Sequence, residues 1–157
     1  MSKTISLCIL TLVASMVLLG CKDAVKDTHP QQLVTKRQAI FKDFTRTLEP
    51  MGLVARDRQP YNPREFNVQA LELQRLSTLP WGYFAADGNY PPTRAKPEVW
   101  QKPAEFKQAQ DNYAQAVSQL LKASQAGDLE AIRPVVDAVQ KSCKSCHDQF
   151  RNAAAGN

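Results

Sequence analysis

The amino-acid sequence predicts an all-α fold, an antiparallel bundle of four helices, and three observations support this prediction. Four segments carry apolar residues at spacings of three and four, the pattern of helices with one buried face. No segment of any length alternates between apolar and polar residues as a half-buried strand does. Helix start and stop signals separate the four segments, and only one of the connections is long.

The first helix is predicted to begin at Leu33. Arg37 interrupts its apolar stripe, because it occupies a position that faces the core. Either the stem of Arg37 packs while its charged head reaches solvent, or the guanidinium binds a buried anion. Pro50 is expected to kink or end this helix. The stripe consists of Val34, Arg37, Phe41, Phe44, Leu48 and Met51.

The second helix is predicted to run from Asn62 to about Leu79. Asn62 suits the N-cap, Pro63 the first helical position and Glu65 the third. The segment has two apolar stripes, of which one faces the core. The other is either a contact with a second subunit or a set of scattered surface residues. The two stripes are Phe66-Ala70-Leu73 and Val68-Leu71-Leu79.

Residues 80–103 form a long connection that is rich in proline, glycine and aromatic residues. Long irregular segments in compact domains are functional or disordered, and this many aromatic residues favour an ordered segment. The aromatic side chains would pack around the rim of a bound group or simply close the core. They are Trp81, Tyr83, Phe84, Tyr90 and Trp100.

The third and fourth helices are separated by a stop signal and an N-cap, Gly127 and Asp128. Pro103 opens the third helix. Pro134 is unfavourable inside the fourth, so a kink or a delayed start is expected there. The apolar stripes are Phe106, Ala109, Tyr113, Val117 and Leu120 in the third helix, and Leu129, Ile132, Val136, Val139, Cys143, Cys146 and Phe150 in the fourth.

The fourth helix ends in Cys143-Lys144-Ser145-Cys146-His147, and C-x-x-C-H is the attachment motif of c-type haem. Two thiols on one helical face can form thioethers to one porphyrin, with His147 as the axial ligand of the iron. A zinc site would need a second pair of ligands, and a thioredoxin-like pair would need a βαβ context. We therefore predict one covalently bound haem c per chain, in the interior of the bundle.

Residues 1–20 have the features of a secretory signal peptide, with Lys3 followed by an apolar run that contains no charge. They end in Leu18-Leu19-Gly20-Cys21, which resembles a bacterial lipobox and would make Cys21 the lipid-modified first residue. The alternatives are an ordinary cleaved signal and an uncleaved anchor. We expect residues 21–30 to form a tether in which His29 is solvated, 31–152 the bundle, and 153–157 a flexible tail.

These features predict a periplasmic location and a lipid anchor, in the outer membrane because Lys22 rather than Asp follows the cysteine. The net charge of +5 falls to +4 when Lys3 leaves with residues 1–20. A surplus this small does not indicate nucleic-acid binding, and it would only weakly favour an acidic redox partner or anionic lipid.

From about Val34 to Arg151 the chain resembles the cytochrome c′ family, the class II c-type cytochromes. The location of C-x-x-C-H on the last helix is specific to this family. The other residues that carry the resemblance are Arg37-Gln38 with Phe41, Leu79-Pro80-Trp81 with Phe84, Lys96-Pro97-Glu98-Val99-Trp100, Phe106, Gly127-Asp128-Leu129, and Asp148 with Arg151.

The resemblance implies a five-coordinate haem with His147 as its proximal ligand, and often a homodimer formed through the first two helices. It implies that Arg37 and Gln38 contact a haem propionate and that Arg151 lies beside His147. We expect Trp81 and Phe84 to contact the cofactor as well. The chain departs from the family at Phe41, where leucine or methionine is usual.

The sixth iron ligand decides between the possible functions. Met51 is the only methionine after the signal peptide, and it lies ten residues from Phe41, or about 15 Å along a helix. An open sixth site under Phe41 is therefore predicted, which favours binding of nitric oxide and carbon monoxide. An electron-transfer cytochrome with a six-coordinate low-spin haem is the alternative. An enzyme such as a peroxidase is disfavoured, because no acid or base is expected near Phe41.

Overall fold

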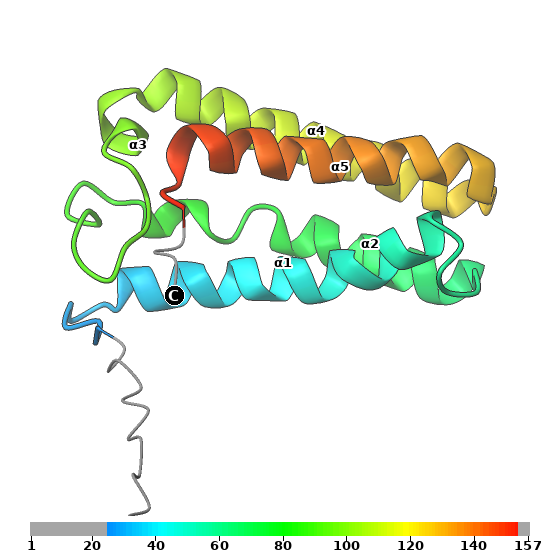
Figure 1. Ribbon diagram of the computed structural model, residues 1–157, viewed down its shortest axis with the longest axis horizontal. Coiled ribbons are helices and arrows are strands. Elements are labelled where there is room, and N and C mark those ends of the chain that lie inside the picture. The colour runs from blue at the N-terminus through cyan, green and yellow to red at the C-terminus, as the bar shows by residue number, and fades with distance from the viewer. Residues whose placement is uncertain (1–24, 154–157) are drawn as a thin grey trace, which may run out of the picture.

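The computed structural model describes residues 25–153, which form the predicted bundle of four long helices. The helices α1 and α4 each pack against both α2 and α5, and neighbouring helices run in opposite directions (Figure 1). A 3₁₀ helix, η1 (Trp81–Tyr83), and the short α3 (Glu98–Gln101) lie in the long connection. The long helices are α1 (Leu33–Ala55), α2 (Pro63–Leu76), α4 (Pro103–Ala126) and α5 (Leu129–Phe150).

The predicted signal peptide, Cys21 and residues 154–157 of the predicted tail lie outside the described residues. Between residues 25 and 153, no helix combines the length and the apolar character needed to span a bilayer.

The local signals for helix ends are confirmed. The side chain of Asn62 accepts hydrogen bonds from the N–H groups of Arg64 and Glu65, at 3.1 and 3.3 Å, and so caps α2. The Asp128 carboxylate caps α5 through the N–H of Glu130 at 3.0 Å. Between α4 and α5, Gly127 adopts a φ of 72°, a left-handed conformation that glycine reaches without strain.

Neither proline interrupts its helix, so the expected end at Pro50 and the expected delayed start at Pro134 are wrong, while the kink that was the alternative at each site stays a prediction. The helix α1 continues past Pro50 to Ala55, and α5 begins at Leu129 without a delay at Pro134. A proline in a helix interior costs about 3 kcal/mol, whereas each fully buried apolar side chain contributes about 1.5–3 kcal/mol. The residues near both prolines are buried, which explains why packing outweighs the local rule. They are Met51, Val54, Ile132 and Val136.

The helix α2 ends at Leu76, three residues before the expected end at Leu79. Its first predicted stripe faces the core, where Phe66, Ala70 and Leu73 are at most 2% exposed. The second stripe faces outward, with exposed fractions of 59% for Val68, 48% for Leu71 and 41% for Leu79. No element between residues 25 and 153 covers this second stripe.

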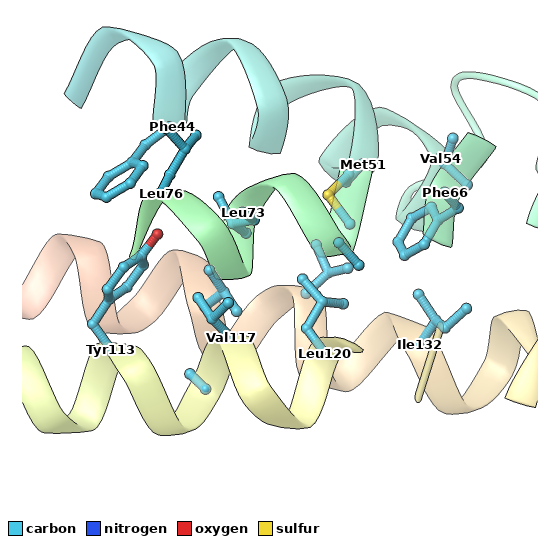
Figure 2. Close-up of a cluster of buried hydrophobic side chains, with 14 residues drawn as sticks. Phe44, Met51, Val54, Phe66, Leu73, Leu76, Tyr113, Val117, Leu120 and Ile132 are labelled. Carbon is cyan, nitrogen blue, oxygen red and sulfur yellow. The ribbon is translucent and has the colours of Figure 1, made fainter. Parts of the chain in front are cut away.

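Two apolar clusters hold the bundle together. The larger one runs along the bundle axis and receives side chains from all four long helices (Figure 2). The smaller one comprises Val99, Phe106 and Phe150, together with Trp81 and Phe84, which are partly buried. It joins α3, the start of α4 and the end of α5, and the C-x-x-C-H motif lies between the two clusters.

The end of the predicted tether differs from expectation, because His29 is not solvated. Its ring stacks on Tyr90 at a centroid distance of 5.1 Å, and its side chain is 19% exposed. The sequence contains no periodic signal for this contact, because Tyr90 follows 61 residues later in the irregular connection.

Candidate cofactor site

The two cysteines of the motif point into the bundle from α5. The Cys143 side chain packs against the larger apolar cluster, and Cys146 packs against the smaller one. Both are unpaired thiols and partly buried. Burial, followed by the charge of Cys146, raises the pKa of the Cys143 thiol to about 11, and burial also raises the pKa of Cys146. Both sulfurs are therefore protonated at neutral pH.

His147 lies opposite Phe41 of α1, and their ring centroids are 6.5 Å apart at an angle of 74°. Partial burial lowers the pKa of His147, and the positive charge of Arg151 lowers it further. The imidazole is therefore held in its neutral form, which is the form that binds a metal.

Phe41 is the centre of an aromatic box at the same end of the bundle. Its ring makes edge-to-face contacts with Phe44, Trp81 and Phe84, at centroid distances of 5.5, 6.0 and 6.3 Å. The indole N–H of Trp81 is already bonded to the carbonyl of Ser77 at 2.7 Å. The surroundings of Phe41 are therefore apolar, and the one donor among its aromatic neighbours is occupied.

Arg37 is only 3% exposed, so its charged head does not reach solvent. Its Nη1 donates to Tyr83 O at 2.8 Å, and its Nη2 donates to Gly88 O at 3.0 Å and to Thr93 Oγ1 at 2.6 Å. The guanidinium also lies 4.5 Å above the Phe84 ring centroid. Burial lowers the pKa of Arg37.

Three of the five N–H groups of Arg37 are thus used by the connection between α2 and α4, and the other two have no partner among residues 25–153 and could bind an anion. Position 88 has no room for a side chain, because a Cβ there would lie 2.9 Å from Ala85 O and 3.1 Å from Arg37 Nη1. Gln38, the other predicted propionate ligand, is exposed on the next position of α1.

Arg151 lies beside His147, with its Nη1 3.4 Å from the Nδ1 of the imidazole. The two side chains share an open cavity of about 400 Å³ with Arg94 and Lys96, which belong to the long connection. Lys96 donates to the carbonyl of Asp148 at 2.8 Å, and Arg94 donates to that of Asn152 at 2.9 Å. The connection is therefore attached to the C-terminal end of α5.

The residues around the motif fit a haem. The donor set is that of a c-type haem site: two free thiols one helical turn apart on α5, followed directly by an imidazole that can bind iron. The ring of Phe41 lies on the other side of that imidazole, with a centroid distance of 6.5 Å. The hydroxyl of Tyr113 near Cys143 is buried and has no partner within the described part of the protein.

Some members of this site were not predicted from the sequence. The acceptors of Arg37 lie 46 to 56 residues away in an irregular segment. Tyr113 was predicted only as a core residue of its helix. An unpartnered hydroxyl depends on its tertiary surroundings, so the spacing pattern of the helix contained no signal for it.

Known proteins provide independent evidence on this arrangement. The profile of the cytochrome c′ family matches residues 32–151. A cytochrome c′ of Alcaligenes xylosoxydans xylosoxydans is 33% identical over 125 residues, which cover 78% of this chain and 94% of that protein.

Solved structures of one such protein are also similar. One is a nitric oxide complex of a variant of cytochrome c prime from Alcaligenes xylosoxidans, with a TM-score of 0.76 and 30% identity over 82% of this chain and 100% of that chain. A carbon monoxide-bound variant of the same protein has the same TM-score of 0.76, identity of 30% and coverage of 82% and 100%.

Proposed function

Since this chain belongs to the cytochrome c′ family, whose members carry covalently attached haem c, we propose that it binds nitric oxide and carbon monoxide at a five-coordinate haem. Cys143 and Cys146 attach the porphyrin through thioethers, and His147 provides the axial ligand. When bound, the haem iron supplies a coordination position for a diatomic molecule and a one-electron redox couple. The chain therefore acts as a gas-binding and electron-exchanging protein rather than an enzyme.

The observation that carries this proposal is the apolar box around Phe41, opposite His147. Phe41 has no lone pair to donate to iron, and Met51 is fully buried in the larger apolar cluster. Among the residues that the structure describes, no second strong axial ligand thus lies near Phe41, which supports an open sixth position. The nitric oxide and carbon monoxide complexes of the similar cytochrome c prime support the same choice of ligands.

The remaining contacts orient the cofactor. The two free N–H groups of Arg37 would hold one propionate, with Gln38 at the rim, and Trp81 and Phe84 would line the apolar face. Arg151 would donate toward the proximal side. In the apolar box around Phe41 a bound dioxygen would have no donor, so oxygen transport is disfavoured.

The visible spectrum of the reduced holoprotein, recorded with and without carbon monoxide, tests this function. We expect a high-spin five-coordinate spectrum that changes on addition of carbon monoxide. A low-spin six-coordinate spectrum that does not respond to the gas would instead favour the alternative, a cytochrome dedicated to electron transfer.

We propose further that the protein is periplasmic and anchored by lipid at Cys21, in the outer membrane. Replacing Cys21 by serine should move the protein from the membrane fraction to the soluble periplasmic fraction, because the acylated residue is lost. Detergent phase partitioning of both forms measures this. A wild-type protein that is already fully soluble in the periplasm would exclude the anchor.

The exposed stripe on α2 supports a homodimer formed through α1 and α2. Leu71→Lys should convert the dimer to a monomer, because it places a charge in the centre of an apolar contact. Sedimentation of the wild type and the variant measures the change. Leu129→Lys places a charge at a partly buried position on α5, and it is the control that shows whether general destabilisation alone splits the dimer. A wild type that is monomeric at high concentration would refute the homodimer.

A further inference from the structure

The segment before α1 is bonded to the bundle through Asp27. Its carboxylate accepts hydrogen bonds from the N–H and the hydroxyl of Thr35, at 2.8 and 2.9 Å. It also accepts from the Tyr90 hydroxyl at 3.0 Å and from the N–H of His29 at 3.1 Å. One side chain thus joins the N-terminal segment, α1 and the long connection.

These contacts replace the cap that the helix itself lacks. Gln32, at the N-cap position of α1, is left-handed with a φ of 50° and makes no capping bond with its side chain. The free N–H groups of the first turn are instead satisfied by Asp27 and by the Tyr90 hydroxyl, which accepts from Val34 at 3.3 Å. A carboxylate at this end also interacts favourably with the helix dipole.

Asp27 remains ionised at neutral pH. Desolvation alone would raise the pKa of its carboxyl group, but the hydrogen bonds from Thr35, Tyr90 and His29 lower it to about 2. The carboxylate is therefore available as an acceptor for Thr35 and Tyr90 at any pH well above this value.

His29 adds a second attachment to the long connection. Its ring stacks on Tyr90 at an angle of 18°, and its Nε2 lies 3.2 Å from a carboxylate oxygen of Asp87. Because Nδ1 accepts from the N–H of Gln31 at 3.1 Å, Nε2 is the ring nitrogen that donates to Asp87. Residues 27–29 are called the clamp below.

The clamp lies at the end of the bundle that carries the candidate site. In Figure 1 the start of α1, the long connection and the end of α5 are all at this end, whereas the α1–α2 turn is at the other. The same connection that receives the clamp also provides the acceptors of Arg37.

We propose that the clamp holds the lipid-bearing N-terminus against the haem end of the bundle, so that this end stays close to the membrane surface. This inference rests on the proposed lipid attachment at Cys21. Asp27 is six positions after Cys21, a stretch that spans at most about 20 Å, whereas Leu33 is twelve positions after Cys21, which would span about 40 Å. The helix α1, with 23 residues, is about 35 Å long.

The comparison of these lengths limits how far the haem end can move away from the membrane. With the clamp closed, the chain holds the haem end within about 20 Å of its lipid, a distance shorter than the bundle. With the clamp open, the chain is long enough for either end to touch the bilayer. An apolar diatomic gas partitions into hydrocarbon, so the closed clamp brings the haem close to the phase where that gas concentrates.

Energy transfer from dye-labelled lipid headgroups to the haem tests the proposal in phosphatidylcholine vesicles carrying the holoprotein. Two variants are compared with the wild type. The first carries both Asp27→Ala and His29→Ala. The second has a six-residue segment of alternating glycine and serine inserted between Cys21 and Asp27. The insertion leaves the clamp intact, so it keeps the test valid if the double variant unfolds. Quenching of the dye should fall by at least a factor of about two in both, because the accessible chain roughly doubles in length and energy transfer falls steeply with distance.

Glu65→Gln, an exposed change near the α1–α2 turn, is the control and should leave the quenching unchanged. Equal quenching in the wild type and the insertion variant would overturn the clamp proposal. If fractionation shows that Cys21 carries no lipid, the same proteins are coupled through its thiol to a maleimide lipid. Fractionation then reports whether the lipid anchor exists, and quenching reports separately whether the clamp is closed.

Discussion

Replacing both Cys143 and Cys146 by alanine should abolish covalent attachment of haem. No other described cysteine is available to form a thioether, and His147 alone provides only a reversible coordinate bond. Each single variant should keep one thioether. Mass spectrometry of the denatured chain, after extraction with acidified organic solvent, measures the bound haem directly.

Ser145→Ala is a matched control, because Ser145 lies between the two cysteines and is exposed. It should retain the full haem mass. A double cysteine variant that also retains the haem mass after denaturation would refute the assignment of the attachment site.

Replacing Phe41 by alanine should raise the affinity for carbon monoxide. The aromatic ring lies opposite His147 and is held by contacts with Phe44, Trp81 and Phe84. An incoming diatomic molecule has to displace this ring without gaining a hydrogen bond. Displacing a packed aromatic ring costs on the order of 1 kcal/mol or more, which corresponds to about a five-fold change in Kd.

Carbon monoxide association and dissociation rates of the ferrous protein measure this effect. Phe66→Leu is the control, since Phe66 of α2 is buried in the larger apolar cluster and its aromatic contact is with Tyr61, not with Phe41. It should lower stability and leave the affinity nearly unchanged. An affinity that is equal in the wild type and in Phe41→Ala would show that Phe41 does not control access to the iron.

The features that the sequence predicted well depend on residues close together along the chain. Asn62, Gly127 and Asp128 act within one turn of the helix ends they define. The buried stripe of α2 follows from the helical period, which repeats every few residues. The C-x-x-C-H motif is equally local, so the haem family was recognisable before any tertiary contact was known.

Features that depend on distant residues were predicted less well. Pro50 and Pro134 break a local rule, and only the burial of their neighbours explains why the helices continue. The two alternatives for Arg37 were both consistent with its position in the stripe. Its burial and its three bonds to the long connection excluded a solvated head group.

By itself, the sequence determined the helices, their buried faces and the chemistry of cofactor attachment, because each of these is encoded within a few residues. Only the tertiary structure decided which side chains meet across the bundle. The opposition of Phe41 and His147 and the attachment of Asp27 to Tyr90 join residues 106 and 63 positions apart. Such pairs form because packing of the helices and of the irregular connection brings them together, and no spacing along the chain specifies that geometry.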